Sequence, residues 1–182
     1  MKAPQQDSPD SRYMADTHEV INVSSELQDF NLYRQDHALR DAVQREGAGW
    51  ADEQLSTFGE HAGTAGYLEL GHLANKFTPE FDTHDRFGNR IDLVKYHPAY
   101  HHLMQTAIEN GIHSSPWVDP KAGAHVARAA MFYMQSQVEA GHGCPVTMTF
   151  AAVPSLRTTP ELARIWEPKI TARVYDPRNL PM

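Results

Sequence analysis

The side chains best suited to chemistry are a cysteine and several of the eleven histidines. Cys144 is the only cysteine, and His142 lies two residues before it, so an imidazole could activate a thiolate nucleophile at the start of a following helix. A glycine separates the two residues, and a single internal cysteine is usually an inert buried thiol. We therefore favour a structural role for Cys144 and predict no catalytic residue in this chain.

The best-spaced histidine pair is His97 and His101 in the string HPAYHH, since residues four apart can share a helical face. The sequence has no HExxH, no paired cysteines and no acidic third ligand at a fixed spacing from this pair. Packing or surface roles explain these histidines better, and we predict no metal site. A second polar cluster, Asp82, His84 and Asp85, falls in an expected loop, where carboxylates usually satisfy turn backbone groups.

Composition narrows the function classes further. The 182 residues are 41% hydrophobic and 21% charged, which fits one globular domain. A net charge of −7 without a basic patch argues against nucleic acid or an anionic membrane surface as a partner. The sequence contains no GxSxG, GxxxxGK[ST] or GxGxxG motif. Because no signal peptide or membrane-length apolar run is evident, we expect a cytoplasmic protein.

A helical segment from Lys121 to Leu156 is the expected centre of the fold. Its apolar residues recur four apart, so one wide face should be buried. We expect Gly141 and Gly143 to end a first helix in the left-handed conformation, and Pro145 to lie in the first turn of a second. The residues of the apolar stripe are Ala122, Val126, Ala130, Met134 and Val138, flanked by Ala129 and Tyr133.

The remaining helices are expected to surround this segment. Capping residues and prolines predict helices in 37–46, 98–110 and 160–167, the last ended by Pro168, and a helical stretch from 50 to 77 with a break near Gly63 and Thr64. We expect 1–30 to form a flexible N-terminal arm and an extended lead-in, with 1–16 mobile and Val20, Ile21, Val23, Leu27 and Phe30 available to pack on the helical body. The predicted class is mainly α, a helical bundle with a short β hairpin possible near residues 80–96.

Four strings, in this order, carry a resemblance to a known family. They are REGAGW at 45–50, GYLELGHLAN at 66–75, YHPAYHHLMQ at 96–105 and ARAAMFYMQSQVEAGHGCPVTMTFAAVP at 127–154. Together they resemble the N-terminal helical domain of AidB-type acyl-CoA dehydrogenases. The resemblance spans nearly everything from residue 31 to 178, and it implies that 31–182 form that helical domain.

The resemblance implies a flavin-dependent parent enzyme that acts on an acyl-CoA substrate and assembles as a homo-oligomer. In that family FAD lies between later domains, and a flavin-contact motif of the form MTEKQGGSDV would follow the tail DPRNLPM. The printed sequence ends at Met182. We therefore expect these residues alone to bind no FAD and to be inactive. The alternative is a non-catalytic helical module for protein interaction or oligomerisation through exposed apolar faces.

The resemblance also assigns one stretch to the substrate site. In acyl-CoA dehydrogenases the helix corresponding to 145–156 tends to form part of the acyl pocket wall. A competing interpretation is ordinary core, because Val146, Phe150 and Val153 recur at helical spacing. The residues that the resemblance places in the wall are Thr147, Met148, Phe150 and Ala151.

Overall fold

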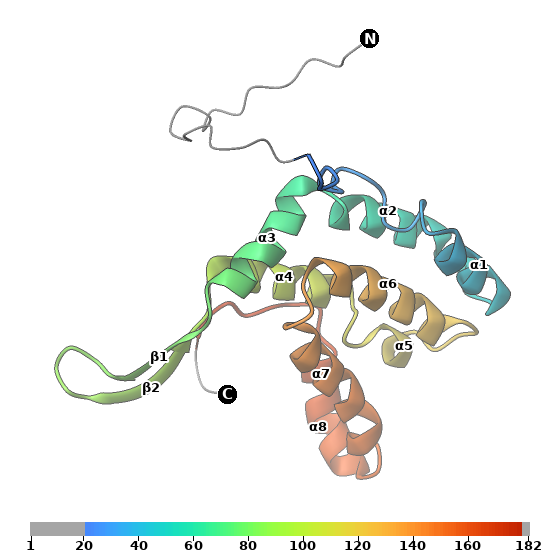
Figure 1. Cartoon of the computed structure of the whole chain (residues 1–182). Coiled ribbons are helices and arrows are strands. Elements are labelled where there is room, and N and C mark those ends of the chain that lie inside the picture. Colours follow the sequence, from blue (N-terminus) through green and yellow to red (C-terminus); the bar gives the residue numbers. More distant parts are fainter. Residues whose placement is uncertain (1–20, 180–182) are drawn as a thin grey trace.

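The computed structural model describes residues 21–179, so the predicted mobile arm at 1–16 lies outside the described residues. Within them the chain is mainly helical with one two-stranded hairpin, which confirms the predicted fold class (Figure 1). The elements are α1 (His37–Arg45), η2 (Gly49–Ala51), α2 (Asp52–Ala62), α3 (Ala65–Lys76), β1 (Glu80–His84), β2 (Arg90–Lys95), α4 (Pro98–Glu109), α5 (Ser115–Val118), α6 (Ala124–Val138), α7 (Gly143–Leu156) and α8 (Pro160–Ile170).

Helix α6 is the centre of the core, as predicted, because it packs against α1, α2, α3 and α5 (Figure 1). Met134 is fully buried, and the buried face continues through Ala127 and Ala130 to Val138. The expected apolar face was too wide, since Ala122, Ala129 and Tyr133 are exposed. The neighbouring helices leave one side of α6 uncovered. Ala129 and Tyr133 lie on that side, and Ala122 precedes the helix.

The helix starts follow the capping signals in the sequence. Asp36 accepts a hydrogen bond from the backbone N–H of Leu39 (2.8 Å), and Thr64 accepts one from Tyr67 (3.3 Å). The break between α2 and α3 therefore lies where it was predicted. Gly71 explains one of the glycines in α3, because a Cβ there would overlap the carbonyl oxygen of Val138 at the end of α6. The glycine allows the two helices to cross at backbone distance.

The turn between α6 and α7 differs from the prediction. Neither Gly141 nor Gly143 adopts a positive φ, and Gly143 is the first residue of α7. Helix α6 ends at Val138 because Glu139 is extended (φ −161°) and its carboxylate accepts the N–H groups of Gly141 (2.5 Å) and His142 (2.9 Å). A buried carboxylate, rather than a left-handed glycine, makes this turn. Pro145 lies in the first turn of α7, as predicted.

Helices α7 and α8 pack side by side and project from the rest of the molecule (Figure 1). Pro168 was expected to end α8, yet the helix continues to Ile170. The proline lies in the final turn, where the N–H of Thr171 still donates to the Glu167 carbonyl (3.0 Å), so only the bond that Pro168 cannot donate is lost. The segment between α4 and α6 contains the short helix α5.

The hairpin and the lead-in complete the chain. Strands β1 and β2 pair antiparallel with Phe81 opposite Val94, and the hairpin extends away from the helices (Figure 1). Of the predicted lead-in residues, Ile21, Val23 and Leu27 are exposed and only Phe30 packs against the core; Val20 lies outside the described residues. The other three precede the first backbone contacts to α2, which begin at residue 29. None of the described helices combines the length and the apolar character needed to cross a membrane.

Candidate functional site

Two stacked tyrosines form a wall where β2 leads into α4. Tyr96 follows β2 and Tyr100 lies in the first turn of α4, and their ring centroids are 4.2 Å apart with the planes inclined by 18°. Burial, with smaller effects of neighbouring groups that include Tyr96, raises the pKa of Tyr100 to about 12. The phenol therefore stays protonated at neutral pH. A hollow opens on each side of this tyrosine wall.

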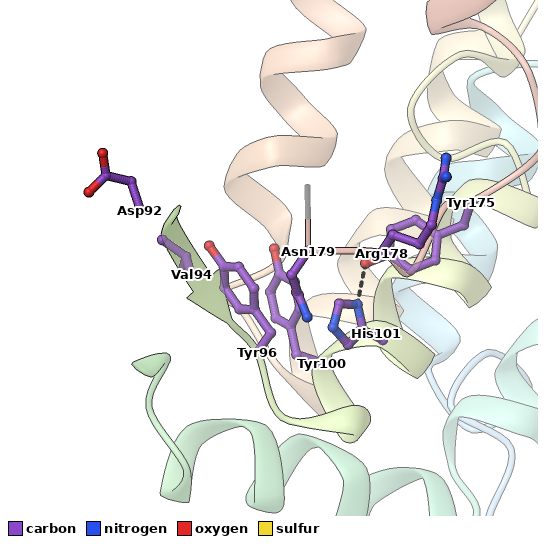
Figure 2. A pocket seen from close by; sticks show the side chains of 8 residues that line it. All are labelled: Asp92, Val94, Tyr96, Tyr100, His101, Tyr175, Arg178 and Asn179. Carbon is purple, nitrogen blue, oxygen red and sulfur yellow. Dashed lines mark hydrogen bonds between the residues drawn. The ribbon is translucent and has the colours of Figure 1, made fainter. Parts of the chain in front are cut away.

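The first hollow, which we call the Tyr175 hollow, has a volume of about 280 Å³ (Figure 2). The hydroxyl of Tyr175 lies 2.7 Å from Nδ1 of His101, a contact across 74 residues of sequence. The guanidinium of Arg178 is already paired with both carboxylate oxygens of Asp176. The residues that line the Tyr175 hollow are Asp92, Val94, Tyr96, Tyr100, His101, Tyr175, Arg178 and Asn179.

The second hollow, the Cys144 hollow, is larger, at about 470 Å³. It lies between the segment after α3, the tyrosine wall and the turn from α6 into α7. Cys144 and Met148, one helical turn apart on α7, are both exposed at its edge. Phe77, Pro79 and Pro145 add apolar surface. A hollow of this kind suits an apolar or aromatic group rather than a charged one.

A buried polar network supports the turn beneath the Cys144 hollow. Nδ1 of His142 lies 2.7 Å from the Glu139 carboxylate, and Nε2 lies 2.9 Å from the side-chain amide of Gln135, which donates to the Tyr67 hydroxyl (2.8 Å). Burial alone would raise the pKa of Glu139, but hydrogen bonds from the backbone and imidazole of His142 and from Gly141 hold that pKa below its usual value. The carboxylate is thus fully engaged in holding the turn.

This network decides the nucleophile hypothesis. Both ring nitrogens of His142 face Glu139 and Gln135, so the imidazole does not point at Cys144. The thiol is exposed rather than buried, which differs from the expected inert core cysteine. Cys144 therefore remains an accessible thiol at the edge of a hollow, without an adjacent base.

His97 and His101, the best-spaced histidine pair, each make contacts that stabilise the fold. His97 caps α4 through its ring, which accepts from the N–H of Ala99 (3.2 Å), and stacks on Phe77 with centroids 4.8 Å apart. His101 turns instead to Tyr175. Within residues 21–179 no three histidine, cysteine or carboxylate side chains gather as a metal-binding group.

The predicted loop role holds for Asp85 only, because Asp82 and His84 lie in strand β1. Asp85 accepts the N–H groups of Phe87 (2.8 Å) and Asn89 (2.9 Å), and these bonds, with the Asn89 amide as the largest contribution, lower the pKa of the carboxyl. Asp82 forms an ion pair with Lys95 across the hairpin, and His84 contacts Thr83. The residues of this cluster stabilise the hairpin and its loop.

The four predicted wall residues divide between two sides of α7. Met148 lines the Cys144 hollow, and Thr147 and Ala151 are exposed beside it at helical spacing. Phe150 lies elsewhere: its ring centroid is 4.9 Å from that of Trp117 and 4.2 Å from the Arg128 guanidinium carbon. The resemblance therefore grouped Phe150 with three residues from which the structure separates it.

Sequence reasoning missed the tyrosine wall, Tyr175 and Arg128. The spacing of Tyr96 and Tyr100, four apart across Pro98, was a usable signal for a stacked pair. Arg128, a lone cation in the alanine-rich buried stretch of α6, was a second. Tyr175 gave no local signal, because its contact to His101 depends on how the tail packs.

Neither hollow offers a set of residues for a dinucleotide cofactor. A pyrophosphate needs unpaired cations or a backbone cradle at a helix start, and the one guanidinium that lines the two hollows, Arg178, is paired with Asp176. These two hollows therefore do not fit the pyrophosphate of FAD, and we derive no step through that cofactor.

Comparisons with known proteins agree with this architecture. The family model described as the adaptive response protein AidB N-terminal domain matches residues 22–177. The curated protein "Putative acyl-CoA dehydrogenase AidB" of Escherichia coli (strain K12) is 47% identical over 167 residues, which is 91% of this chain and 31% of that protein. The chain thus spans about a third of the length of this relative.

Two solved structures share the fold. "Bd2924 apo-form" superposes with a TM-score of 0.73 at 26% identity, covering 84% of this chain and 31% of the other. Caenorhabditis elegans ACDH-11, solved in complex with C11-CoA, gives a TM-score of 0.72 at 23% identity, covering 90% of this chain and 29% of the other, and shows likeness of fold alone. Because the family model covers most of the sequence, the chain belongs to the AidB N-terminal domain family, which is homologous to acyl-CoA dehydrogenases.

Proposed function

We propose that this chain acts as the N-terminal helical part of a flavin-dependent acyl-CoA dehydrogenase and that one face of α7 forms a wall of the acyl site. The proposal extends to this chain the activity that the E. coli relative's name carries. The base, the flavin contacts and the rest of the site would come from residues outside those described here.

The observation that carries the proposal is an uncovered face of α7. Cys144, Thr147, Met148 and Ala151 lie at i, i+3, i+4 and i+7, and all four are exposed. The same face continues into the Cys144 hollow through Cys144 and Met148. A small, mainly apolar surface beside an apolar hollow is suited to an acyl chain, because burying methylene groups there is favourable.

Acyl-CoA dehydrogenation removes a proton from Cα and a hydride from Cβ of the thioester, and a bound flavin supplies the hydride acceptor. Two of the titratable side chains around the Cys144 hollow, those of Glu139 and Tyr100, do not fit the role of the base. Glu139 is held by three hydrogen bonds and the Tyr100 phenol is protonated, its pKa being about 12. The role left to these residues is to shape the cavity and to exclude water from it.

A chimera tests this proposal. Residues 22–177 would replace the matching segment of the E. coli relative, and kcat/KM would be measured for saturated acyl-CoA thioesters of increasing chain length. We expect Met148→Ala to change the ratio of long-chain to short-chain kcat/KM by about tenfold, the scale of a few methylene contacts. Phe150→Ala should lower stability, through lost packing on Trp117 and Arg128, and leave that ratio nearly unchanged.

The exposed Tyr133→Ala on α6 is the matched control, since Tyr133 lines neither hollow. A flavin-loaded, active chimera whose chain-length profile ignores Met148→Ala would contradict the proposed wall.

A second candidate function is assembly through α8. Leu162, Ile165 and Trp166 share one face at i, i+3 and i+4, all are exposed, and α8 has no buried residue. We propose that a second copy of the chain covers this face. Light scattering of the chain and of Ile165→Glu should then show a concentration-dependent dimer that the variant loses. Arg164→Glu, between them in sequence, is the control, and a wild-type chain that stays monomeric at all concentrations would rule out this role.

A further inference from the structure

Arg128, a half-buried arginine on α6, has one fully buried donor atom that is unused among the described residues. Arg128 donates from Nε to the Ile112 carbonyl (2.8 Å), and its guanidinium carbon lies 4.8 Å and 4.2 Å from the ring centroids of Phe132 and Phe150. Its Nη2 is fully buried and has no hydrogen-bond partner among the described residues. Burial also lowers the pKa of this group. Leaving a buried cationic donor without an acceptor costs free energy, so a group that accepts a hydrogen bond from Nη2 would stabilise this position.

Arg128 lines a small pocket between η2, α2, α5, α6 and the tail, which we call the Arg128 pocket. Its volume is about 70 Å³. One water occupies roughly 30 Å³ in the liquid, so the pocket has room for a carboxylate-sized group and not for a cofactor. The lining residues are Trp50, Gln54, Ser115, Asp119, Ala124, Ala127, Arg128, Met131 and Arg173.

The charge around this pocket favours an anion. Arg173 adds a second guanidinium, which packs against Gly111 so closely that a Cβ there would lie 2.9 Å from its Cζ. The one acidic lining residue, Asp119, is paired with Lys121 (2.8 Å). Lys121 in turn lies over the Trp50 ring, 3.7 Å from its centroid. Arg128 and Arg173 therefore bring two cationic side chains to the lining, against one carboxylate that already has a counter-ion.

The neutral lining narrows the ligand class. Ser115 and Gln54 bring side chains that can donate hydrogen bonds, and Ala124, Ala127 and Met131 form an apolar side. We propose that the Arg128 pocket binds a single carboxylate group, held by the guanidiniums of Arg128 and Arg173. The carboxylate has two possible sources: a small free carboxylate in solution, or the side chain of an aspartate or glutamate in a polypeptide segment that docks over the pocket.

Acetate is the probe, read by ¹⁹F NMR of the 182-residue chain labelled with 5-fluorotryptophan. Trp50 lines the pocket, and Trp166 on α8 serves as an internal reference. With acetate replacing chloride at constant ionic strength, the Trp50 resonance should shift in a saturable way while that of Trp166 stays fixed. Arg128→Met should weaken acetate binding about tenfold or more, because a charge-assisted bond is lost.

If Arg128→Met does not fold, a second variant still tests the proposal. Arg173 is exposed, so Arg173→Gln should leave the fold intact and weaken acetate binding severalfold. Arg86→Gln in the hairpin loop is the matched control and should bind as the wild type does. A Trp50 resonance that shows no saturable change would mean that the pocket holds water only. A resonance that responds equally in wild type and Arg173→Gln would mean that acetate binds without Arg173, and either result would overturn the proposal.

The chimera with the E. coli relative separates the two sources. If a polypeptide carboxylate fills the pocket there, acetate will no longer shift the Trp50 resonance that it shifts in the isolated chain. If the ligand is a free carboxylate, the shift will persist in both proteins. Neither result depends on whether α7 lines an acyl site, so failure of one proposal is distinguishable from failure of the other.

Discussion

At the scale of single residues, Glu139 has the largest structural role in the candidate site. Its carboxylate accepts from two backbone N–H groups and from the imidazole of His142, and so fixes the turn that presents Cys144 and Met148. A carboxylate with this many donors is stabilised in its charged form. The turn between α6 and α7 should therefore depend on the ionisation of one buried acid.

The pH dependence of stability tests this role. Because the folded-state pKa of Glu139 lies below its ordinary value of 4.5, the contribution of Glu139 to stability is fully present above about pH 4.5 and is lost as pH falls below it. Urea unfolding at pH 7, 5 and 3.5 should show Glu139→Gln less stable than wild type at pH 7, with the difference shrinking toward pH 3.5. Glu69→Gln, an exposed carboxylate on α3, is the control. A constant difference across this range would contradict the assigned role.

Local sequence signals predicted residue roles unevenly. Asp36, Thr64 and Asp85 act within four residues of their own positions, so their capping and loop roles could be read directly. The His101 to Tyr175 contact could not, since it joins residues 74 apart. The resemblance grouped Phe150 with Met148, although residues two apart on a helix project to different sides. In the structure Phe150 packs on Trp117 and Met148 lines the Cys144 hollow.

At the scale of elements, close approach of α3 and α6 is the most specific packing feature. Gly71 lies against the Val138 carbonyl, whereas Gly66, in the same helix, has open space around its Cα. The two glycines of α3 thus differ in environment although the sequence shows them alike. Substitution by alanine separates a packing role from a propensity effect.

We expect Gly71→Ala to destabilise the chain by about 1–3 kcal/mol, the usual cost of overpacking, because the added methyl must push the two helices apart. Gly66→Ala should instead stabilise it by about 0.5–1 kcal/mol through helix propensity. Chemical denaturation of both variants checks the two signs. Equal effects, or stabilisation by both, would show that α3 and α6 do not meet as described.

The sequence predicted the long helices better than it predicted where they end. Existence and type of each long helix followed from periodicity and caps, but the end of α8 did not, since Pro168 stands in a last turn that needs few further hydrogen bonds. Likewise the glycines after α6 suggested a left-handed cap that Glu139 makes unnecessary. A side-chain acceptor overrode a backbone preference, and this depends on tertiary burial.

At the scale of the whole molecule, the helices around α6 form the core while α7, with α8, leaves one face uncovered (Figure 1). Membership of the AidB N-terminal domain family gives this arrangement a context, and the curated relative is about three times as long. The central claim of our account is that the exposed face of α7 borders the acyl group of a bound thioester.

Cys144 offers the most direct measurement of that claim, because its exposed thiol lies on the same face of α7 as Met148. In the flavin-loaded chimera, the alkylation rate of Cys144 would be followed by peptide mass spectrometry with no ligand, with CoA and with saturating acyl-CoA. We predict that acyl-CoA slows alkylation about tenfold or more and that CoA alone does not, since only the acyl chain covers the thiol. Equal rates under all three conditions, with acyl-CoA bound, would contradict the account.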